Sequence, residues 1–218
     1  MPQQFDLIVF DWDGTLMDSA GVIAASIQAS CQDLGLPVPS TQEARHIIGL
    51  GLNEAIAHLL PNLSPADYPK LVARYRHHFL GQDADIPLFD GAENLVRDLH
   101  QAGFLLGVAT GKGRPGLERV LDQTGLRAFF HDSRCADECF SKPHPEMLQQ
   151  LTQALGVMPQ RTLMIGDTSH DLLMAQNAGV AALGVSYGAH PRSDLTALAP
   201  LACVDSIEEL EQWLLTNA

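Results

Sequence analysis

The chain has 218 residues, of which 46% are hydrophobic and 18% are charged, as is ordinary for a soluble globular protein with a substantial core. Its 26 acidic and 13 basic residues give a formal net charge of −13. This acidic balance argues against partners such as nucleic acid or an anionic membrane surface, because both need basic patches.

The sequence has neither the features of a signal peptide nor an apolar run of membrane-spanning length. Its four cysteines are too few for a disulfide scaffold and include no CxxC pair. Cys135 and Cys139 with His131 lack the spacing of a zinc knuckle, which favours buried or incidental thiols. We therefore expect a cytoplasmic protein, as a monomer or a homodimer.

The first predicted element is a buried strand, Leu7–Phe10, which ends in charge within "DLIVFDWDGTLMDS". Residues two apart in an extended chain point to the same side, so we expect Asp11 and Asp13 to face one spot, with Trp12 turned away. A buried carboxylate is costly unless it is paired. The two carboxylates therefore indicate either a bound cation or an accident of loop composition.

Residues 19–85 contain no convincing strand and four helical patterns: "AGVIAASIQASCQDLG", "TQEARHII", "LNEAIAHLL" and "SPADYPKLVARYRHHFLG". They predict a helical cap domain over 19–85, inserted after the first strand of a core domain formed by 1–18 and 86–218. Within the insertion, Gly49 and Gly51 form a G-x-G pattern. Such a pattern is weak support for phosphate binding, and a turn between helices is the favoured explanation.

The remainder alternates short apolar strands with amphipathic helices that stop at Gly103, Gly125, Gly156 and Gly179. The predicted strands are Leu105–Ala109, Thr162–Ile165 and Ala181–Val185, with weaker candidates at Ser133–Cys135 and Ala202–Val204. This alternation predicts an α/β fold with a doubly wound, mostly parallel, Rossmann-like sheet covered by helices on both faces. Ligands of such sheets bind beyond the carboxyl ends of the strands.

Polar residues follow the predicted strands and can converge on one rim: Asp11, Asp13, Thr110, Gly111, Lys142, Asp167 and Asp171. Each alone has an ordinary explanation as a helix cap, a turn or a surface lysine. Together, four carboxylates beside one or two lysines would repel one another. A hard divalent cation removes that repulsion, and Mg²⁺ is the natural candidate because it prefers oxygen ligands and pairs carboxylates with phosphate.

Four segments, "DWDGTLMDS", "VATGK", "SKPHPE" and "GDTSHD", resemble the four motifs of the haloacid dehalogenase superfamily, in the same chain order. With the helical insertion, the chain is similar to the phosphoglycolate-phosphatase-like branch, which carries an α-helical cap. The resemblance implies a Mg²⁺-dependent phosphatase that hydrolyses a small phosphorylated metabolite, of the phosphoglycolate or sugar phosphate class, through an aspartyl-phosphate.

Three alternatives differ in what they require of the sequence. A phosphomutase of the β-phosphoglucomutase type uses the same scaffold, and the sequence separates it poorly from a phosphatase. A haloacid dehalogenase needs no acid at position 13, where this chain has Asp13. A non-enzymatic binding or regulatory protein is disfavoured because no catalytic position is lost.

The resemblance also implies roles for individual residues. Asp11 would be the nucleophile and Asp13 the general acid and base. Asp11, Asp167 and the backbone carbonyl of Asp13 would bind Mg²⁺, with Asp171 supporting the metal or Lys142. Thr110 and Lys142 would hold the phosphoryl group. Further phosphate or substrate contacts are expected from Trp12, Gly111, Arg45 and Gly49, although relatives often have asparagine where this chain has Gly111.

Overall fold

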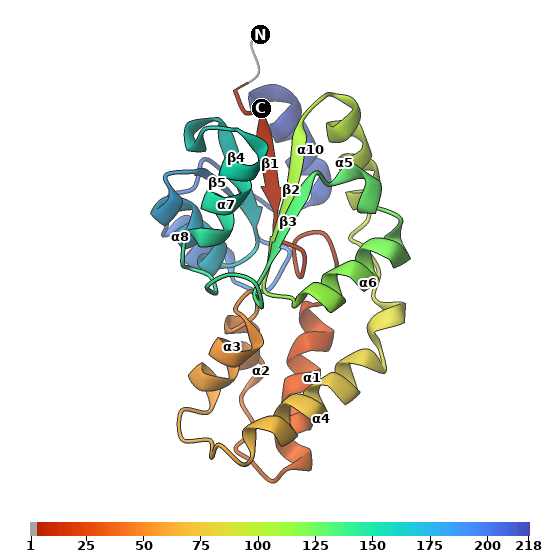
Figure 1. Ribbon diagram of the computed structural model, residues 1–218, viewed down its shortest axis with the longest axis vertical. Coiled ribbons are helices and arrows are strands. Elements are labelled where there is room, and N and C mark those ends of the chain that lie inside the picture. Colours follow the sequence, from red (N-terminus) through yellow and green to blue (C-terminus); the bar gives the residue numbers. More distant parts are fainter. Residues whose placement is uncertain (1–3) are drawn as a thin grey trace.

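The computed structural model describes residues 4–218, and its centre is a parallel sheet (Figure 1). The strands are β1 (Leu7–Phe10), β2 (Leu105–Thr110), β3 (Asp132–Cys135), β4 (Thr162–Gly166), β5 (Ala181–Val185) and β6 (Cys203–Val204). Their order in the sheet is β3-β2-β1-β4-β5-β6, and every neighbouring pair is parallel. This is the strand order of the Rossmann fold, so the predicted fold class is confirmed.

Helices cover both faces of the sheet, because alternate residues of each strand point to opposite sides. Ile8 and Phe10 pack with α5 (Ala92–Gln101), α6 (Arg114–Thr124) and α10 (Ile207–Asn217). Leu7 and Val9 pack with α7 (Glu146–Leu155), α8 (Ser169–Ala178) and α9 (Arg192–Thr196). Short 3₁₀ helices occupy Asp83–Asp85, Arg127–Phe129 and Pro159–Arg161. Since β1 is covered on both faces, all four of its residues are buried, as its continuous apolar run predicts.

Glycines end the core helices close to the predicted positions. Gly125, Gly156 and Gly179 directly follow α6, α7 and α8 in the left-handed conformation, which glycine adopts at little steric cost. Helix α5 ends one residue earlier relative to its glycine, because Ala102 is its cap residue and Gly103 follows.

Residues 19–85 form helices and no strand, as predicted: α1 (Ala20–Asp33), α2 (Thr41–His46), α3 (Leu52–Leu59) and α4 (Tyr68–Leu80). They lie beyond the carboxyl ends of the strands (Figure 1). Cys31, Ile56 and Leu71 form a small hydrophobic core among these helices, separate from the two clusters on the sheet. From residue 4 to residue 218, every helix is too short or too polar to cross a membrane.

Candidate active site

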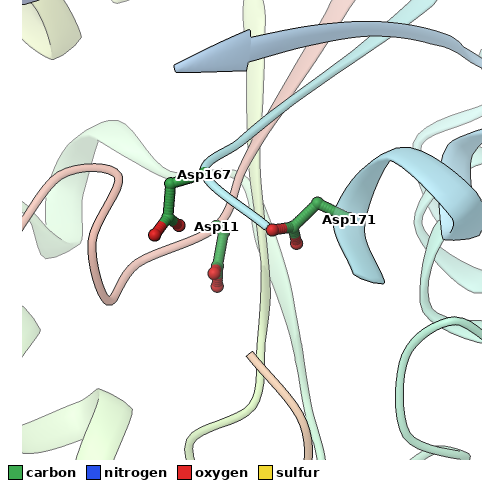
Figure 2. A group of neighbouring side chains, drawn as sticks. All are labelled: Asp11, Asp167 and Asp171. Carbon is green, nitrogen blue, oxygen red and sulfur yellow. The ribbon is translucent and has the colours of Figure 1, made fainter. Parts of the chain in front are cut away.

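Three buried carboxylates meet at the carboxyl end of the sheet (Figure 2). Asp11 follows β1, Asp167 follows β4, and Asp171 lies in the first turn of α8. Because β1 and β4 are neighbours in the sheet, their ends bring Asp11 and Asp167 together. One carboxylate oxygen from each of the three residues lies within 4.8 Å of the others, and all three side chains are fully buried.

Lys142 supplies the positive charge beside this cluster. Its Nζ lies 2.9 Å from Asp11 Oδ1 and 2.6 Å from Asp171 Oδ1, and its side chain is fully buried. Burial opposes the charged ammonium, but the two carboxylates outweigh it and raise the pKa of Lys142. Lys142 is therefore a permanent cation that compensates only part of the negative charge of the cluster.

Asp167 is held by residues from two distant segments. Its Oδ1 accepts a hydrogen bond from Thr15 Oγ1 at 2.9 Å, and its Oδ2 accepts one from the backbone N–H of Ala189 at 2.7 Å. Burial, followed by the charge of Asp171, raises the pKa of Asp167 to about 7. Burial likewise raises the pKa of Asp11 well above its ordinary value, although Lys142 opposes that shift.

Two glycines leave the space that the Asp167 carboxylate occupies. A Cβ at Gly14 would lie 2.1 Å from Asp167 Oδ2, and a Cβ at Gly188 would lie 2.2 Å from the same oxygen. Contacts this short do not occur, so any side chain at either position would displace the carboxylate. Both glycines are therefore part of the construction of the site.

The donor set of this cluster fits a hard cation. Asp11 Oδ2 is buried, and no described residue offers it a hydrogen bond. Such an orphaned oxygen is costly, and a cation bound by oxygen ligands removes the cost. Carboxylate oxygens from Asp11 and Asp167 suit Mg²⁺, which keeps water as its remaining ligands.

Asp171 is already committed to other partners. Its Oδ1 pairs with Lys142, while its Oδ2 accepts hydrogen bonds from the backbone N–H and the Oγ1 of Thr168, at 3.1 and 2.6 Å. These contacts cap α8. Of the two supporting roles expected for Asp171, the positioning of Lys142 is the one that these contacts favour.

Asp13 is not one of the three residues whose carboxylate oxygens form this cluster. Instead, Asp13 Oδ1 accepts a hydrogen bond from Ser19 Oγ at 2.7 Å and pairs with Lys112 Nζ at 2.9 Å. Trp12 does turn away: its side chain is buried in the core, so only its backbone remains for a phosphate contact.

Thr110 and Gly111 lie at the end of β2, beside β1. Thr110 is buried, and its Oγ1 accepts a hydrogen bond from the backbone N–H of Lys112 at 3.1 Å. A Cβ at Gly111 would lie 2.6 Å from the carbonyl oxygen of Leu50 and 2.7 Å from that of Gly49. Position 111 therefore requires glycine, because the backbone of the helical insertion packs directly against it and leaves no room for a side chain.

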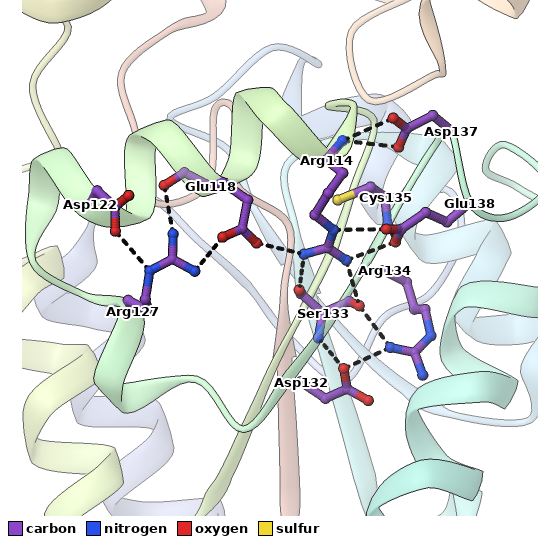
Figure 3. Close-up of polar contacts among 10 residues, drawn as sticks. All are labelled: Arg114, Glu118, Asp122, Arg127, Asp132, Ser133, Arg134, Cys135, Asp137 and Glu138. Atoms are coloured by element: carbon purple, nitrogen blue, oxygen red, sulfur yellow. Dashed lines mark hydrogen bonds and ion pairs between the residues drawn. The ribbon is translucent and has the colours of Figure 1, made fainter.

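The loops around the site are tied together at the edge of the sheet (Figure 3). The guanidinium of Arg114 binds both carboxylate oxygens of Glu138, at 2.8 and 2.7 Å, and Ser133 Oγ at 2.6 Å. Its backbone N–H donates to Asp137 at 2.9 Å. A planar fork on one carboxylate is a geometrically specific contact. It joins the start of α6, which follows Lys112, to the turn after β3.

A cavity of about 740 Å³ is lined by residues of the helical insertion and of the loops after the strands, including Asp13, Gly111 and Gly49. Its other polar lining includes Lys112, the last residue of the segment "VATGK", and Arg76 of α4. Lys112 could be found from the sequence by its place two residues after Thr110, in the segment "VATGK". Neither Ser19 nor Ala189 carried a comparable signal, because their contacts join separate loops.

Arg45, expected as a substrate contact, is not among the residues that line this cavity. Its guanidinium donates instead to two backbone carbonyl oxygens, Gly188 O at 2.5 Å and Ala189 O at 3.2 Å. It faces a second cavity of about 980 Å³ on the flank of the molecule.

Comparison with known proteins extends these observations. Residues 8–185 match the family described as haloacid dehalogenase-like hydrolase. The chain is 34% identical over 212 residues to the probable phosphatase IndB of Dickeya dadantii, covering 94% of this chain and 91% of that protein. It is 32% identical to the phosphoglycolate phosphatase of Vibrio cholerae, covering 97% and 98%. The crystal structure of a predicted phosphoglycolate phosphatase from Haemophilus somnus has the same fold, with a TM-score of 0.86, 24% identity and coverage of 97% and 99%.

Proposed function

Because the chain belongs to the haloacid dehalogenase-like hydrolase family, we propose that it is a Mg²⁺-dependent phosphatase that hydrolyses a small phosphorylated metabolite through an aspartyl-phosphate. The observation that carries the proposal is Asp11 Oδ2, a buried and unpartnered carboxylate oxygen beside Lys142. The relatives named phosphoglycolate phosphatase favour a substrate of the phosphoglycolate or sugar phosphate class. We expect the protein to act in the cytoplasm.

The first step is attack of an Asp11 oxygen on phosphorus, which forms an acyl phosphate and breaks the bond to the alcohol oxygen. Lys142 pairs with Asp11 Oδ1 and so fixes the orientation of the carboxylate. Together with Thr110 at the end of β2, Lys142 also compensates charge on the phosphoryl oxygens. When bound by Asp11 and Asp167, Mg²⁺ supplies positive charge between the carboxylate and the phosphate, which otherwise repel each other.

Asp13 moves the protons in both steps. It gives a proton to the departing alkoxide and later takes one from the water that hydrolyses the acyl phosphate. Ser19 and Lys112 both bind Oδ1, and no described residue hydrogen-bonds Oδ2. Oδ2 is therefore the atom that carries the proton, and it belongs to a residue that lines the cavity.

We further propose that 19–85 form a cap domain over a core domain of 1–18 and 86–218. The separate hydrophobic core of the helices supports this division. The cap closes the cavity that would hold the organic part of the substrate.

The experiment that tests the proposal is turnover of p-nitrophenyl phosphate by the metal-depleted protein, before and after addition of Mg²⁺. We expect no turnover without metal and recovery with it, and no turnover by Asp11→Asn at normal thermal stability. Intact-mass measurement on a quenched reaction should find a phosphoryl adduct that Asp11→Asn lacks. Full activity in chelator, or in Asp11→Asn, contradicts the proposal. Product analysis with sugar phosphates then distinguishes hydrolysis from a mutase reaction.

A further inference from the structure

Arg45 connects the helical cap to the core through a single loop. It lies near the end of α2, and its guanidinium reaches across to Gly188 O and Ala189 O. Two N–H donors in one rigid plane suit two neighbouring carbonyl groups, which a lysine ammonium matches less well. Arg45 therefore recognises the backbone of this loop rather than a substrate.

The same loop holds Asp167. The carbonyl of Gly188 and the N–H of Ala189 belong to one peptide group. Arg45 binds that carbonyl oxygen, and the N–H donates to Asp167 Oδ2 at 2.7 Å. A peptide whose carbonyl binds a cation becomes a stronger N–H donor, because hydrogen bonds in a chain polarise one another. Arg45 in the cap is thus connected to Asp167, the proposed metal ligand, through hydrogen bonds to the two ends of one peptide group.

Two histidines of the core fix the same end of α2. His170 Nε2 and His190 Nε2 lie 2.8 and 3.0 Å from the backbone carbonyl oxygen of His46. The backbone N–H of Ser169 donates to His190 Nδ1 at 3.0 Å, so the proton of that imidazole lies on Nε2. The rings of His46 and His190 also stack, with centroids 4.8 Å apart. The carbonyl at the helix end, which lacks a partner within the helix, finds both partners in the core.

The cap segment that follows contacts the other loops of the site. A Cβ at Gly49 would lie 3.0 Å from Thr168 Oγ1, and the backbone N–H of Gly51 donates to Ser141 Oγ at 2.8 Å. Thr168 caps α8 through Asp171, and Ser141 directly precedes Lys142. The docked cap therefore restrains the loops that position the acidic cluster, and Arg45 has the shortest route to a ligand.

We infer that Arg45 is a positioning residue, which couples closure of the cap to the Mg²⁺ site by holding the Gly188–Ala189 peptide against Asp167. The inference rests on the proposed function. Coupling between two equilibria is reciprocal, so bound Mg²⁺ also favours the closed cap. A partner of a metal ligand typically contributes roughly 10- to 100-fold to metal affinity. Arg45 acts on Asp167 through an intervening peptide group, so we expect its loss to lower Mg²⁺ affinity by about tenfold, the lower end of that range.

The test is a calorimetric titration of the metal-depleted proteins with Mg²⁺, which requires no turnover. Arg45→Ala should bind Mg²⁺ about tenfold more weakly than the wild type. Arg45→Lys, which keeps one donor, should lie between them. The matched control is Arg74→Ala, because Arg74 pairs with Asp33 inside the cap and should leave Mg²⁺ affinity unchanged. If Arg45→Ala fails to fold, the comparison of Arg45→Lys with the wild type decides the question.

Kinetics with p-nitrophenyl phosphate separate positioning from substrate recognition. At low Mg²⁺ concentration the Arg45→Ala variant should turn over substrate more slowly than the wild type. At saturating Mg²⁺ its kcat should be close to the wild-type value. If Arg45 instead bound an anionic leaving group, its replacement by alanine would raise KM only for substrates with such a leaving group. Equal Mg²⁺ affinity in Arg45→Ala and wild type overturns the inference and leaves the proposed function standing. Absence of Mg²⁺ binding by the wild type overturns the metal assignment itself.

Discussion

Asp167→Asn should make the metal-free protein more stable at alkaline pH while removing its response to Mg²⁺. Asp167 is fully buried, and burial with the neighbouring Asp171 raises its pKa from 3.8 to about 7. Asparagine has nearly the same shape. Its Oδ1 can accept the hydrogen bond from Ala189, and its Nδ2 can donate to the hydroxyl of Thr15, so both present contacts survive. Only the negative charge is lost.

The sign and size of the effect follow from proton linkage. Between pH 3.8 and about 7, the folded metal-free protein holds the proton on Asp167 that the unfolded chain has released. Stability of the metal-free wild type therefore falls as pH rises through that range, and the full cost is present above it. At 1.36 kcal/mol for each pKa unit, the cost is on the order of 4 kcal/mol at pH 8 and much smaller at pH 5. Asp167→Asn avoids this cost at both pH values.

The assay is thermal unfolding in EDTA at pH 8 and pH 5, with and without excess Mg²⁺. About 4 kcal/mol in a chain of this length corresponds to a Tm increase on the order of 10 °C at pH 8, and less at pH 5. Mg²⁺ should raise the Tm of the wild type but not of the variant, because the ion stabilises only a folded state that binds it. Asp90→Asn, at an exposed carboxylate, serves as the control and should change little. A variant no more stable than wild type at pH 8 in EDTA refutes the reasoning.

Three other substitutions test separate parts of the site. Asp13→Asn should slow alkyl phosphates by roughly 10²–10⁴-fold, yet release a burst of phenolate from an aryl phosphate before it stalls as phosphoenzyme; equal losses without a burst would remove Asp13 from proton transfer. Lys142→Ala leaves two buried carboxylates without their cation, so urea denaturation should show a loss of about 3–5 kcal/mol, and an unchanged midpoint would contradict the pairing. Gly111→Ala places a Cβ 2.6 Å from Leu50 O, so the cap must shift; we expect a loss of about 1–3 kcal/mol and a higher KM, and wild-type values for both would show that the two segments do not pack so closely.

The elements of the fold could be predicted from the sequence because their signals are local. The apolar run Leu7–Phe10 is a strand in the structure with the predicted limits, and Ala181–Val185 is another. Asp11 and Asp167 could be placed together because each directly follows a strand and parallel strands end at one edge. Lys142 and Thr110 could be placed at the same edge because their segments, "SKPHPE" and "VATGK", resemble motifs of the haloacid dehalogenase superfamily in the same chain order.

Only the tertiary structure decided where side chains point once the chain leaves a strand. Asp13 lies just two residues after Asp11, but its carboxylate binds Ser19 and Lys112, and these contacts could not be read from the sequence. Arg45 was assigned to the substrate by its place in the cap, and its partners are backbone carbonyls more than 140 residues away. Sequence periodicity reports the environment of a strand or helix, whereas a loop residue takes its direction from contacts that form only when distant segments pack.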